Sequence, residues 1–207
     1  MDLSALTWKF RLGQVRVVVE PWFWLMAILL GSNFRGPEIA LWIAVVFVSI
    51  LVHELGHAAA TYAFGGTAWI RLYSFGGLTY PSRVFSRWRS VALSLSGPFA
   101  GFALGGLAFA AQMFVPITSP TIAVTLSMLV SVNVAWGLMN LLPIPPLDGG
   151  HVLLELMGPR GERQARYAAI ATAAVVVLLS LRAGMMYTVL LFGSLAYQNY
   201  AALGRSR

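Results

Sequence analysis

Long apolar stretches constrain this chain more than any other feature of its sequence. A helix needs about 20 mostly apolar residues to cross the hydrocarbon core of a bilayer. The 207 residues are 58% hydrophobic and only 10% charged, whereas a soluble domain is about one quarter charged. We therefore expect a single domain over residues 1–207, an all-α polytopic membrane protein of about six transmembrane helices. These span about residues 21–34, 39–64, 89–114, 121–142, 166–181 and 184–203.

Two segments have the composition of strands rather than of helices. Residues 13–20 are rich in valine, and residues 66–80 are β-branched and aromatic around a break at Gly76-Gly77. The second segment predicts a β-hairpin at the membrane surface. Because two strands alone are only marginally stable, we expect a small sheet that unites both segments.

The net charge of +7 indicates how the chain lies across the membrane. With six crossings, only Arg35 and Arg182 fall on one side, and cytoplasmic loops are the ones enriched in cations. This predicts a multi-pass protein of the cell membrane with both termini in the cytoplasm. Because apolar runs separate the cations, we expect no nucleic-acid partner. The side expected to be cytoplasmic carries Lys9, Arg11, Arg16, Arg71, Arg83, Arg87, Arg89, Arg160, Arg163, Arg166, Arg205 and Arg207.

The segment His53-Glu54-Leu55-Gly56-His57 lies inside the second expected helix. Helical positions four apart differ by about 40° and about 6 Å, so both imidazoles can reach one metal ion. Glu54 lies beside them, where it can accept a proton from water without being a ligand. The alternative is a helix face with two core histidines. Within a membrane that alternative leaves a costly carboxylate unmatched, and a divalent cation supplies the missing charge.

A catalytic zinc ion usually takes three protein ligands, so a third is needed. The sequence has no cysteine, which excludes thiolate ligands. Asp148 follows three prolines and precedes two glycines, a segment that breaks the helix and permits a turn toward the metal. One Zn²⁺ ion with ionised Asp148 and Glu54 sums to zero charge. His151 remains an alternative third ligand, because imidazole is an equally good zinc donor.

Two motifs in this order carry a resemblance to a known family. The first is His53-Glu54-Leu55-Gly56-His57, and the second is Asn140-x-x-Pro143-x-Pro145-x-Leu147-Asp148-Gly149. Together they resemble the site-2 protease family of intramembrane zinc metalloproteases, in a short form without a PDZ or CBS domain. Further similarities are Phe75-Gly76-Gly77 in the hairpin and Ser96-Gly97-Pro98 in the third helix.

The resemblance implies a role for each residue of the two motifs. Zinc would be bound by His53, His57 and Asp148, with Glu54 as the general base. Asn140 falls where the family has an asparagine thought to hold the substrate or the developing oxyanion. The alternative for Asn140 is a helix-end residue that bonds a backbone carbonyl near Pro143.

The implied function is zinc-dependent cleavage of transmembrane segments of membrane-tethered proteins within the bilayer. The implied substrate is a single-span membrane protein, such as a membrane-bound transcription factor, an anti-sigma factor or a remnant signal peptide. We also expect the hairpin to offer an edge to which an unwound substrate adds as a strand, or else to be purely structural. The alternative function is a non-proteolytic zinc-binding membrane protein, either a transporter or a pseudoprotease regulator. A transporter would spread polar residues over several helices, whereas here they cluster around Glu54.

Overall fold

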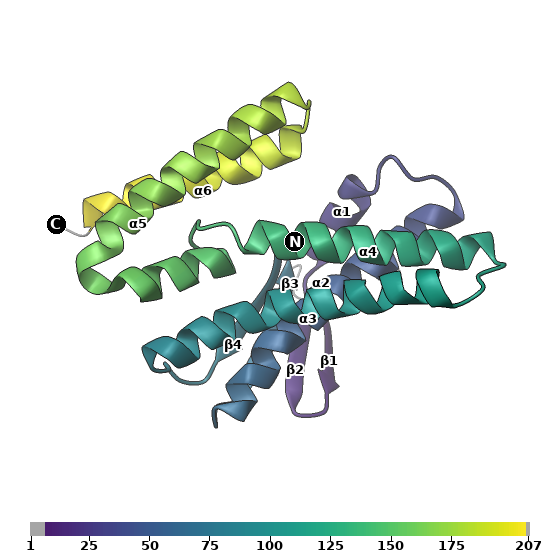
Figure 1. Cartoon of the computed structure of the whole chain (residues 1–207), viewed down its shortest axis with the longest axis horizontal. Coiled ribbons are helices and arrows are strands. Elements are labelled where there is room, and N and C mark those ends of the chain that lie inside the picture. The colour runs from purple at the N-terminus through teal and green to yellow at the C-terminus, as the bar shows by residue number, and fades with distance from the viewer. Residues whose placement is uncertain (1–6, 206–207) are drawn as a thin grey trace. The chain divides into compact units, whose positions relative to one another are not determined.

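The computed structural model describes residues 7–205, and Figure 1 shows the elements in chain order. The chain forms two compact units. The first consists of the residues up to Val84 together with Ser96–Gly137, and the second consists of Phe85–Leu95 together with the residues from Leu138 onward. The elements are β1 (Trp8–Leu12), β2 (Val15–Val19), α1 (Pro21–Leu30), α2 (Pro37–Ala63), β3 (Ala68–Tyr73), β4 (Gly76–Pro81), α3 (Arg87–Phe114), α4 (Pro120–Asn140), α5 (Asp148–Arg182) and α6 (Met186–Arg205).

A four-stranded sheet in the order β1-β2-β3-β4 belongs to the first unit. The β1–β2 and β3–β4 pairs are antiparallel, and β2 pairs parallel with β3, with Val17 opposite Ile70. Parallel strands need a long connection between them, which α1 and α2 provide here. The prediction of a small sheet uniting the two strand segments is confirmed.

Strand β1 was not predicted, and the strand segment expected at residues 13–20 begins two residues too early. Gly13 has a φ of 57° and forms the tight turn between β1 and β2. A left-handed φ of this kind costs glycine little. The alternation in Trp8-Lys9-Phe10-Arg11-Leu12 is the period-two signal of a strand and would have revealed β1.

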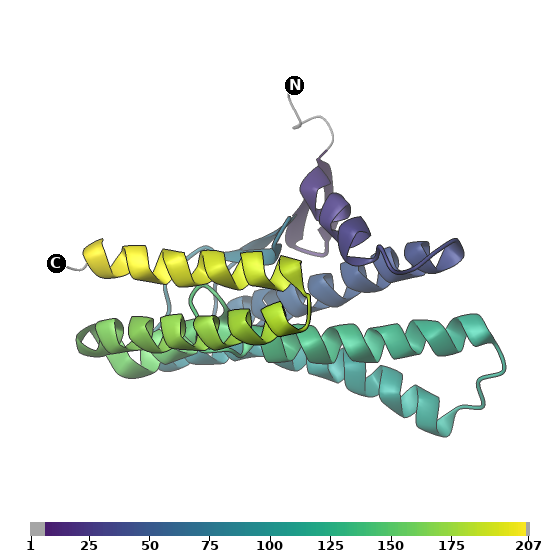
Figure 2. The same ribbon diagram turned by 90° about the horizontal axis from the view of Figure 1, so that it is seen from above.

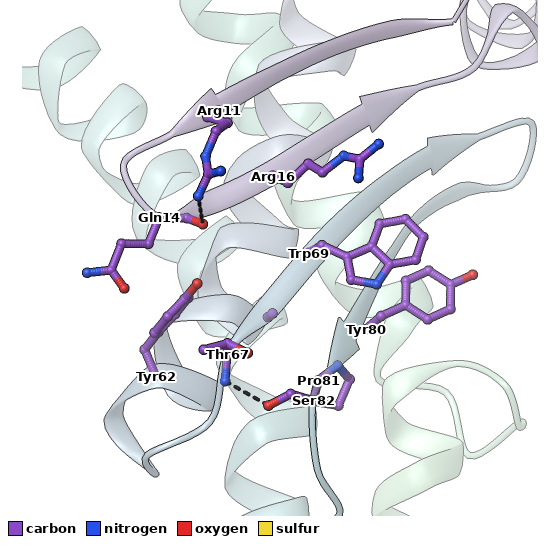
Figure 3. Close-up of a pocket in the computed structure, with 10 residues that line it drawn as sticks. Arg11, Gln14, Arg16, Tyr62, Thr67, Trp69, Tyr80, Pro81 and Ser82 are labelled. Carbon is purple, nitrogen blue, oxygen red and sulfur yellow. Dashed lines mark hydrogen bonds between the residues drawn. The ribbon is translucent and has the colours of Figure 1, made fainter. Parts of the chain in front are cut away.

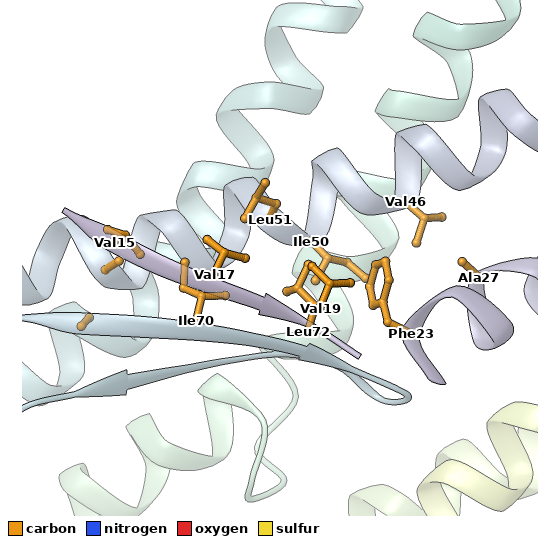
Figure 4. Packing of buried hydrophobic residues seen from close by; sticks show 12 residues of the cluster. Val15, Val17, Val19, Phe23, Ala27, Val46, Ile50, Leu51, Ile70 and Leu72 are labelled. Atoms are coloured by element: carbon orange, nitrogen blue, oxygen red, sulfur yellow. The ribbon is translucent and has the colours of Figure 1, made fainter. Parts of the chain in front are cut away.

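One face of this sheet packs on α2 and α1 (Figure 4). Val17, Val19, Ile70 and Leu72 are 0% exposed. The strands alternate inward and outward residues, so this register gives the sheet one apolar face. Their partners from the helices include Phe23, Ala27, Val46, Ile50 and Leu51. The sheet thereby fixes the rotation of α2, the helix that carries the histidine motif.

Helix α1 ends at Leu30 rather than at residue 34 as expected. The indole Nε1 of Trp42 in α2 donates a hydrogen bond of 3.0 Å to the carbonyl of Ala27. Gly31 caps the helix, and the Trp42 ring lies where a Cβ at Gly31 would be. The last turn of α1 therefore bonds to a side chain of α2 instead of continuing.

The other helices of the first unit are Ser96–Phe114 of α3 and Pro120–Gly137 of α4, which lie side by side in both ribbon views (Figure 2). Gln112 donates a hydrogen bond of 3.0 Å to Ser127 between them. Closer to the histidine motif, buried Asn133 donates to Ser49 Oγ of α2 at 2.9 Å. These polar contacts satisfy side chains that would be costly to leave unbonded in an apolar environment.

Helices α5 and α6 form an antiparallel hairpin in the second unit (Figure 2). Its core contains Ala169, Ala173, Phe192 and Leu195. Helix α5 begins at Asp148, not near residue 166 as expected, because the connection after Asp148 is itself helical. Gly158 interrupts it with a φ of 64°. Proline follows at the next position, where a helix start tolerates it.

Within residues 7–205, four helices are long and apolar enough to cross a membrane: α2, α3, α4 and α5. Helix α1 is also apolar but has only 10 residues. The chain is thus a multi-pass membrane protein, mostly helical with a small sheet, and the predicted fold class is confirmed. Residues 1–6 and 206–207 lie outside the described part of the chain, and the cytoplasmic location of the termini stays a prediction, as does the single domain.

Candidate metal centre

Helix α2 buries the three chemical groups of the first motif. His53 is 2% exposed, Glu54 4% and His57 6%. The two Nε2 atoms lie 3.2 Å apart. A tetrahedral zinc ion with Zn–N bonds of about 2.0–2.1 Å holds two ligand nitrogens about 3.3 Å apart. The distance between the two Nε2 atoms is therefore that of two ligands of one zinc ion. The same distance also fits an N–H···N hydrogen bond between the two rings.

Glu54 is oriented by the sheet. Thr79 of β4 lies with its hydroxyl 2.7 Å from Glu54 Oε2 and 3.0 Å from the Glu54 carbonyl. A hydrogen bond to an ionised carboxylate is one of the stronger kinds. Thr79 could not be predicted from the sequence, because no spacing rule connects residues 25 positions apart. The strand thus holds one carboxylate oxygen of the predicted base.

Two glycines allow α3 and β4 to approach these side chains. A Cβ at Gly97 would overlap Nε2 of His57 and lie 2.8 Å from Nε2 of His53. A Cβ at Gly77 would lie 2.5 Å from Glu54 Oε1. Distances this short are not found between a real Cβ and its neighbours, so neither site accepts a larger residue without displacement. Gly97 of Ser96-Gly97-Pro98 and Gly77 of Phe75-Gly76-Gly77 therefore have a steric role at the motif.

Asp148 lies in the second unit, at the first residue of α5 and half-buried. The partial positive charge of a helix N-terminus favours an ionised carboxylate there. The backbone folds tightly around it: a Cβ at Gly149 would overlap the Leu141 carbonyl, and one at Gly150 would overlap the Pro145 nitrogen. The sharp turn predicted at these two glycines is absent, because both are helical in the first turn of α5; they instead let the preceding segment pack closely against the start of the helix.

A side chain of α6 holds the proline segment in front of Asp148. Buried Asn199 donates a hydrogen bond of 2.7 Å to the Pro145 carbonyl. Arg166 donates to Asn199 Oδ1 at 3.4 Å and is itself bonded to Glu162 at 2.7 Å. No sequence pattern links Asn199 to Asp148, which lies 51 positions earlier. This chain of contacts fixes the backbone from which Asp148 projects.

The structure brings His53, Glu54 and His57 together within the first unit. Asp148, Asn140 and His151 belong to the second unit, where Asn140 is 8% exposed at the end of α4. The His151 side chain is exposed, unlike that of Asp148, which favours the aspartate as a ligand. The fold and the buried histidine motif together define a multi-pass membrane protein with buried side chains of the kinds that can ligate a metal ion.

Comparison with known proteins agrees with this class. The model of peptidase family M50 matches residues 117–181. The proposed zinc metalloprotease sll0528 of Synechocystis sp. is 30% identical over 178 residues, which cover 78% of this chain and 46% of that protein. Zinc metalloprotease MJ0392 of Methanocaldococcus jannaschii is 27% identical over 65% of this chain and 40% of its own length. The chain thus spans less than half the length of these relatives.

A solved structure shares the fold. The site-2 protease from Methanocaldococcus jannaschii superposes with a TM-score of 0.69 at 21% identity, covering 95% of each chain. These comparisons confirm the resemblance to the site-2 protease family that the two motifs indicate. Proteases of this family act on membrane-embedded substrates.

Proposed function

We propose that this chain is a zinc-dependent intramembrane endopeptidase that cleaves transmembrane segments of membrane-tethered proteins. The observation that carries the proposal is the buried pair of Nε2 atoms 3.2 Å apart with Glu54 beside them. Zinc metalloproteases among the relatives support it. A buried carboxylate next to two imidazoles inside an apolar helix has no structural need and is costly without a cation.

The zinc ligands in this proposal are His53, His57 and Asp148, with one ion per chain. Two imidazoles and a carboxylate form a donor set that can hold a metal ion and that zinc commonly takes. Bound zinc supplies Lewis-acid chemistry, because it polarises carbonyl oxygens and acidifies water.

The remaining steps belong to side chains of the protein. Glu54 accepts a proton from the attacking water and returns it to the leaving amine. The Thr79 hydroxyl at Oε2 directs the other oxygen, Oε1, to this proton transfer. Asn140, whose amide can donate two hydrogen bonds, contacts the substrate carbonyl or the developing oxyanion.

A helical substrate must unwind before its peptide bonds can be cleaved. In this proposal the unwound segment binds along the edge of the sheet as an added strand. Strand β3 lies between β2 and β4, so β4 is an edge strand. Ser82 donates its N–H to the Thr67 carbonyl. Hydrogen-bonded and non-bonded pairs alternate along antiparallel strands, so the backbone groups of Gly77 and Thr79 point outward. An added strand would therefore pair beside the residues that contact Glu54.

A pair of substitutions at Thr79 separates edge pairing from the side-chain contact. Thr79→Val removes the hydroxyl and keeps the N–H, whereas Thr79→Pro removes both. If the substrate adds to β4, the proline variant cleaves more slowly than the valine variant while both retain zinc. Equal rates would exclude edge pairing. Ile70 and Leu72 are unsuitable positions for proline, because they belong to the inner strand β3.

The substrate in this proposal is a single-span membrane protein, such as a membrane-bound transcription factor, an anti-sigma factor or a remnant signal peptide. Both termini of the protease lie in the cytoplasm, as the distribution of its cations supports. Because the chain has no cysteine, single cysteines placed at either end test this topology cleanly. A membrane-impermeant thiol reagent should label them only after the cytoplasmic face is opened, and labelling of intact cells would refute the orientation.

The central experiment measures zinc and cleavage of single-span substrates with detergent-purified protein. Glu54→Gln should retain zinc and lose about 10²- to 10⁴-fold in rate, the usual contribution of a general base. Glu38→Gln is the matched control, an exposed glutamate in the first turn of the same helix, and should cleave normally. Equal processing by wild type and Glu54→Gln would remove Glu54 from this role. Wild-type protein without bound metal would refute the proposal as a whole.

A further inference from the structure

The outward face of the sheet carries a row of four side chains, one from each strand. Arg11 pairs with Arg16 across β1 and β2, Arg16 with Trp69 across β2 and β3, and Trp69 with Tyr80 across β3 and β4. Residues paired across strands point to the same face. This row lies opposite the apolar face that packs on α2, and all of its members belong to the first unit.

The row borders a hollow of about 460 Å³ at the end of the sheet near the last turn of α2 (Figure 3). Arg11 donates a hydrogen bond of 3.3 Å to the Gln14 carbonyl, which holds its guanidinium at the turn. Trp69 and Tyr80 stack with ring centroids 4.3 Å apart and planes 8° apart, forming a flat aromatic wall. Thr67 and Ser82, at the other end of the hollow, contribute hydroxyl groups.

The charge of the hollow is unbalanced. Arg11 and Arg16 are directly opposite, and like charges in that arrangement destabilise a sheet. Glu20, the carboxylate that precedes α1, is already paired with Arg71, 2.5 Å away. That hydrogen bond, with a smaller contribution from Tyr80, raises the pKa of Arg71 above its ordinary value. Within residues 7–205, neither Arg11 nor Arg16 forms an ion pair.

An anion with several oxygen atoms would offset this charge. Guanidinium groups bind phosphate through paired N–H donors, and the two hydroxyl side chains can donate as well. The volume is within the range of about 300–1,000 Å³ typical of small-molecule sites, so it admits a phosphate with an attached organic group. The aromatic wall offers that group an apolar contact.

The membrane is the source of phosphate that best fits these surroundings. The chain is a multi-pass membrane protein, and β2 is separated from the apolar helix α1 by a single residue. Trp and Tyr side chains are enriched at membrane interfaces, where one side of the ring is apolar and the other wet. Arginines near the surface attract anionic lipids. We propose that this hollow binds the phosphate of an anionic phospholipid headgroup.

The test compares lipid retention by the detergent-purified full chain in native mass spectrometry. Phosphatidylglycerol should bind more tightly than phosphatidylcholine. Arg11→Gln/Arg16→Gln should weaken phosphatidylglycerol binding about tenfold or more, because hydrogen bonds to charged groups are lost. The control, Arg35→Gln/Arg160→Gln, removes the same net charge from two exposed arginines elsewhere and should bind within about twofold of wild type.

Further measurements distinguish phospholipid from other ligands, and a second variant tests the site if the first does not fold. Unchanged phosphatidylglycerol binding in Arg11→Gln/Arg16→Gln, or an equal loss in the control, would overturn the proposal. Displacement of the lipid by millimolar inorganic phosphate would assign the hollow to free phosphate instead, and displacement by an acidic peptide would assign it to a protein partner. If the glutamine variant does not fold, Arg11→Lys/Arg16→Lys keeps the charge but loses the paired donors. It should bind phosphatidylglycerol several-fold more weakly than wild type, and unaltered binding would refute the site.

Discussion

The histidine motif on α2 and the aspartate segment before α5 are held in place in different ways. His53 and His57 have their relative position from helical periodicity, and a rigid sheet fixes the rotation of their helix. Asp148 follows a proline-rich segment that lies outside regular secondary structure. Asn199 of α6 holds that segment through a hydrogen bond to the Pro145 carbonyl. The relative position of the two histidines thus depends on local helix geometry, whereas the position of Asp148 depends on a contact between residues far apart in the sequence.

The largest expected effect is the loss of zinc affinity when a proposed zinc ligand is removed. Asp148→Ala should lower zinc affinity more than about 100-fold, since even loss of a residue that only supports a ligand costs about 10- to 100-fold. His57→Ala should have a similar effect. His151→Ala is the control, an exposed histidine three residues beyond Asp148, and should keep its zinc. Zinc content after dialysis decides the matter, and loss of zinc only from His151→Ala would exchange the two assignments.

The next effect concerns the histidine side of the comparison. Gly97→Ala inserts a Cβ against both imidazoles and should reduce zinc affinity about 10- to 100-fold, as misplacement of ligands does. Gly106→Ala is the matched control on α3, because nothing lies within 4 Å of its added Cβ. That variant should be unchanged in zinc or slightly more stable, since alanine favours helix by about 1 kcal/mol. Equal zinc titrations for the two variants would show that α3 does not confine the histidines.

A smaller effect is expected for the support of Glu54. Thr79→Val should lower the cleavage rate about tenfold through loss of a hydrogen bond to a charged group, with zinc affinity unchanged. Thr125→Val is a suitable control, a half-buried threonine on α4 whose hydroxyl donates to the Thr121 carbonyl of its own helix. Steady-state kinetics with parallel zinc measurement tests this. A fall in zinc affinity for Thr79→Val would mean that the strand holds the ligands rather than the base.

The smallest effect tests the aspartate side. Asn199→Ala leaves the Pro145 carbonyl without its donor and should cost about 1–3 kcal/mol of stability. Zinc affinity should fall about threefold to tenfold, less than for Gly97→Ala, because a segment outside regular secondary structure can readjust its backbone more readily than a packed helix can. Gln198→Ala, an exposed neighbour on α6, is the control. A larger loss of zinc for Asn199→Ala than for Gly97→Ala would reverse the proposed difference between the two regions.

The sequence predicted what depends on short-range periodicity. The placement of His53, Glu54 and His57 on one helix follows from a spacing of four, and the sheet follows from two short segments rich in valine, β-branched and aromatic residues. It did not reveal Thr79 or Asn199, whose partners lie 25 and 54 positions away. The helical start of α5 was not predicted either, because glycines, Pro159 and charged residues interrupt the apolar sequence between Asp148 and residue 166. The ligand set and the role of Asn140 stay predictions.

The paired arginines of the outward face are a second feature that could not be predicted from the sequence. Arg11 and Arg16 look like two scattered cations in the sequence, and Trp69 and Tyr80 are more than 50 positions further along. Only the register of four strands assembles them into one row. A basic patch built across strands has no linear signature, in contrast to one built along a helix.

The parallel pairing of β2 with β3 also sets the order in which this protein can be made. Arg16 and Trp69 are register partners 53 positions apart, and closing a chain segment of that length costs about 3.5 kcal/mol in entropy. During synthesis, the β1–β2 hairpin emerges first but gains its third strand only after both intervening helices are complete. A nascent chain that stops before residue 68 therefore has the histidine motif without the strand that orients its glutamate. The hydrogen bond from Thr79 to Glu54 therefore forms only after α1 and α2 have been synthesised.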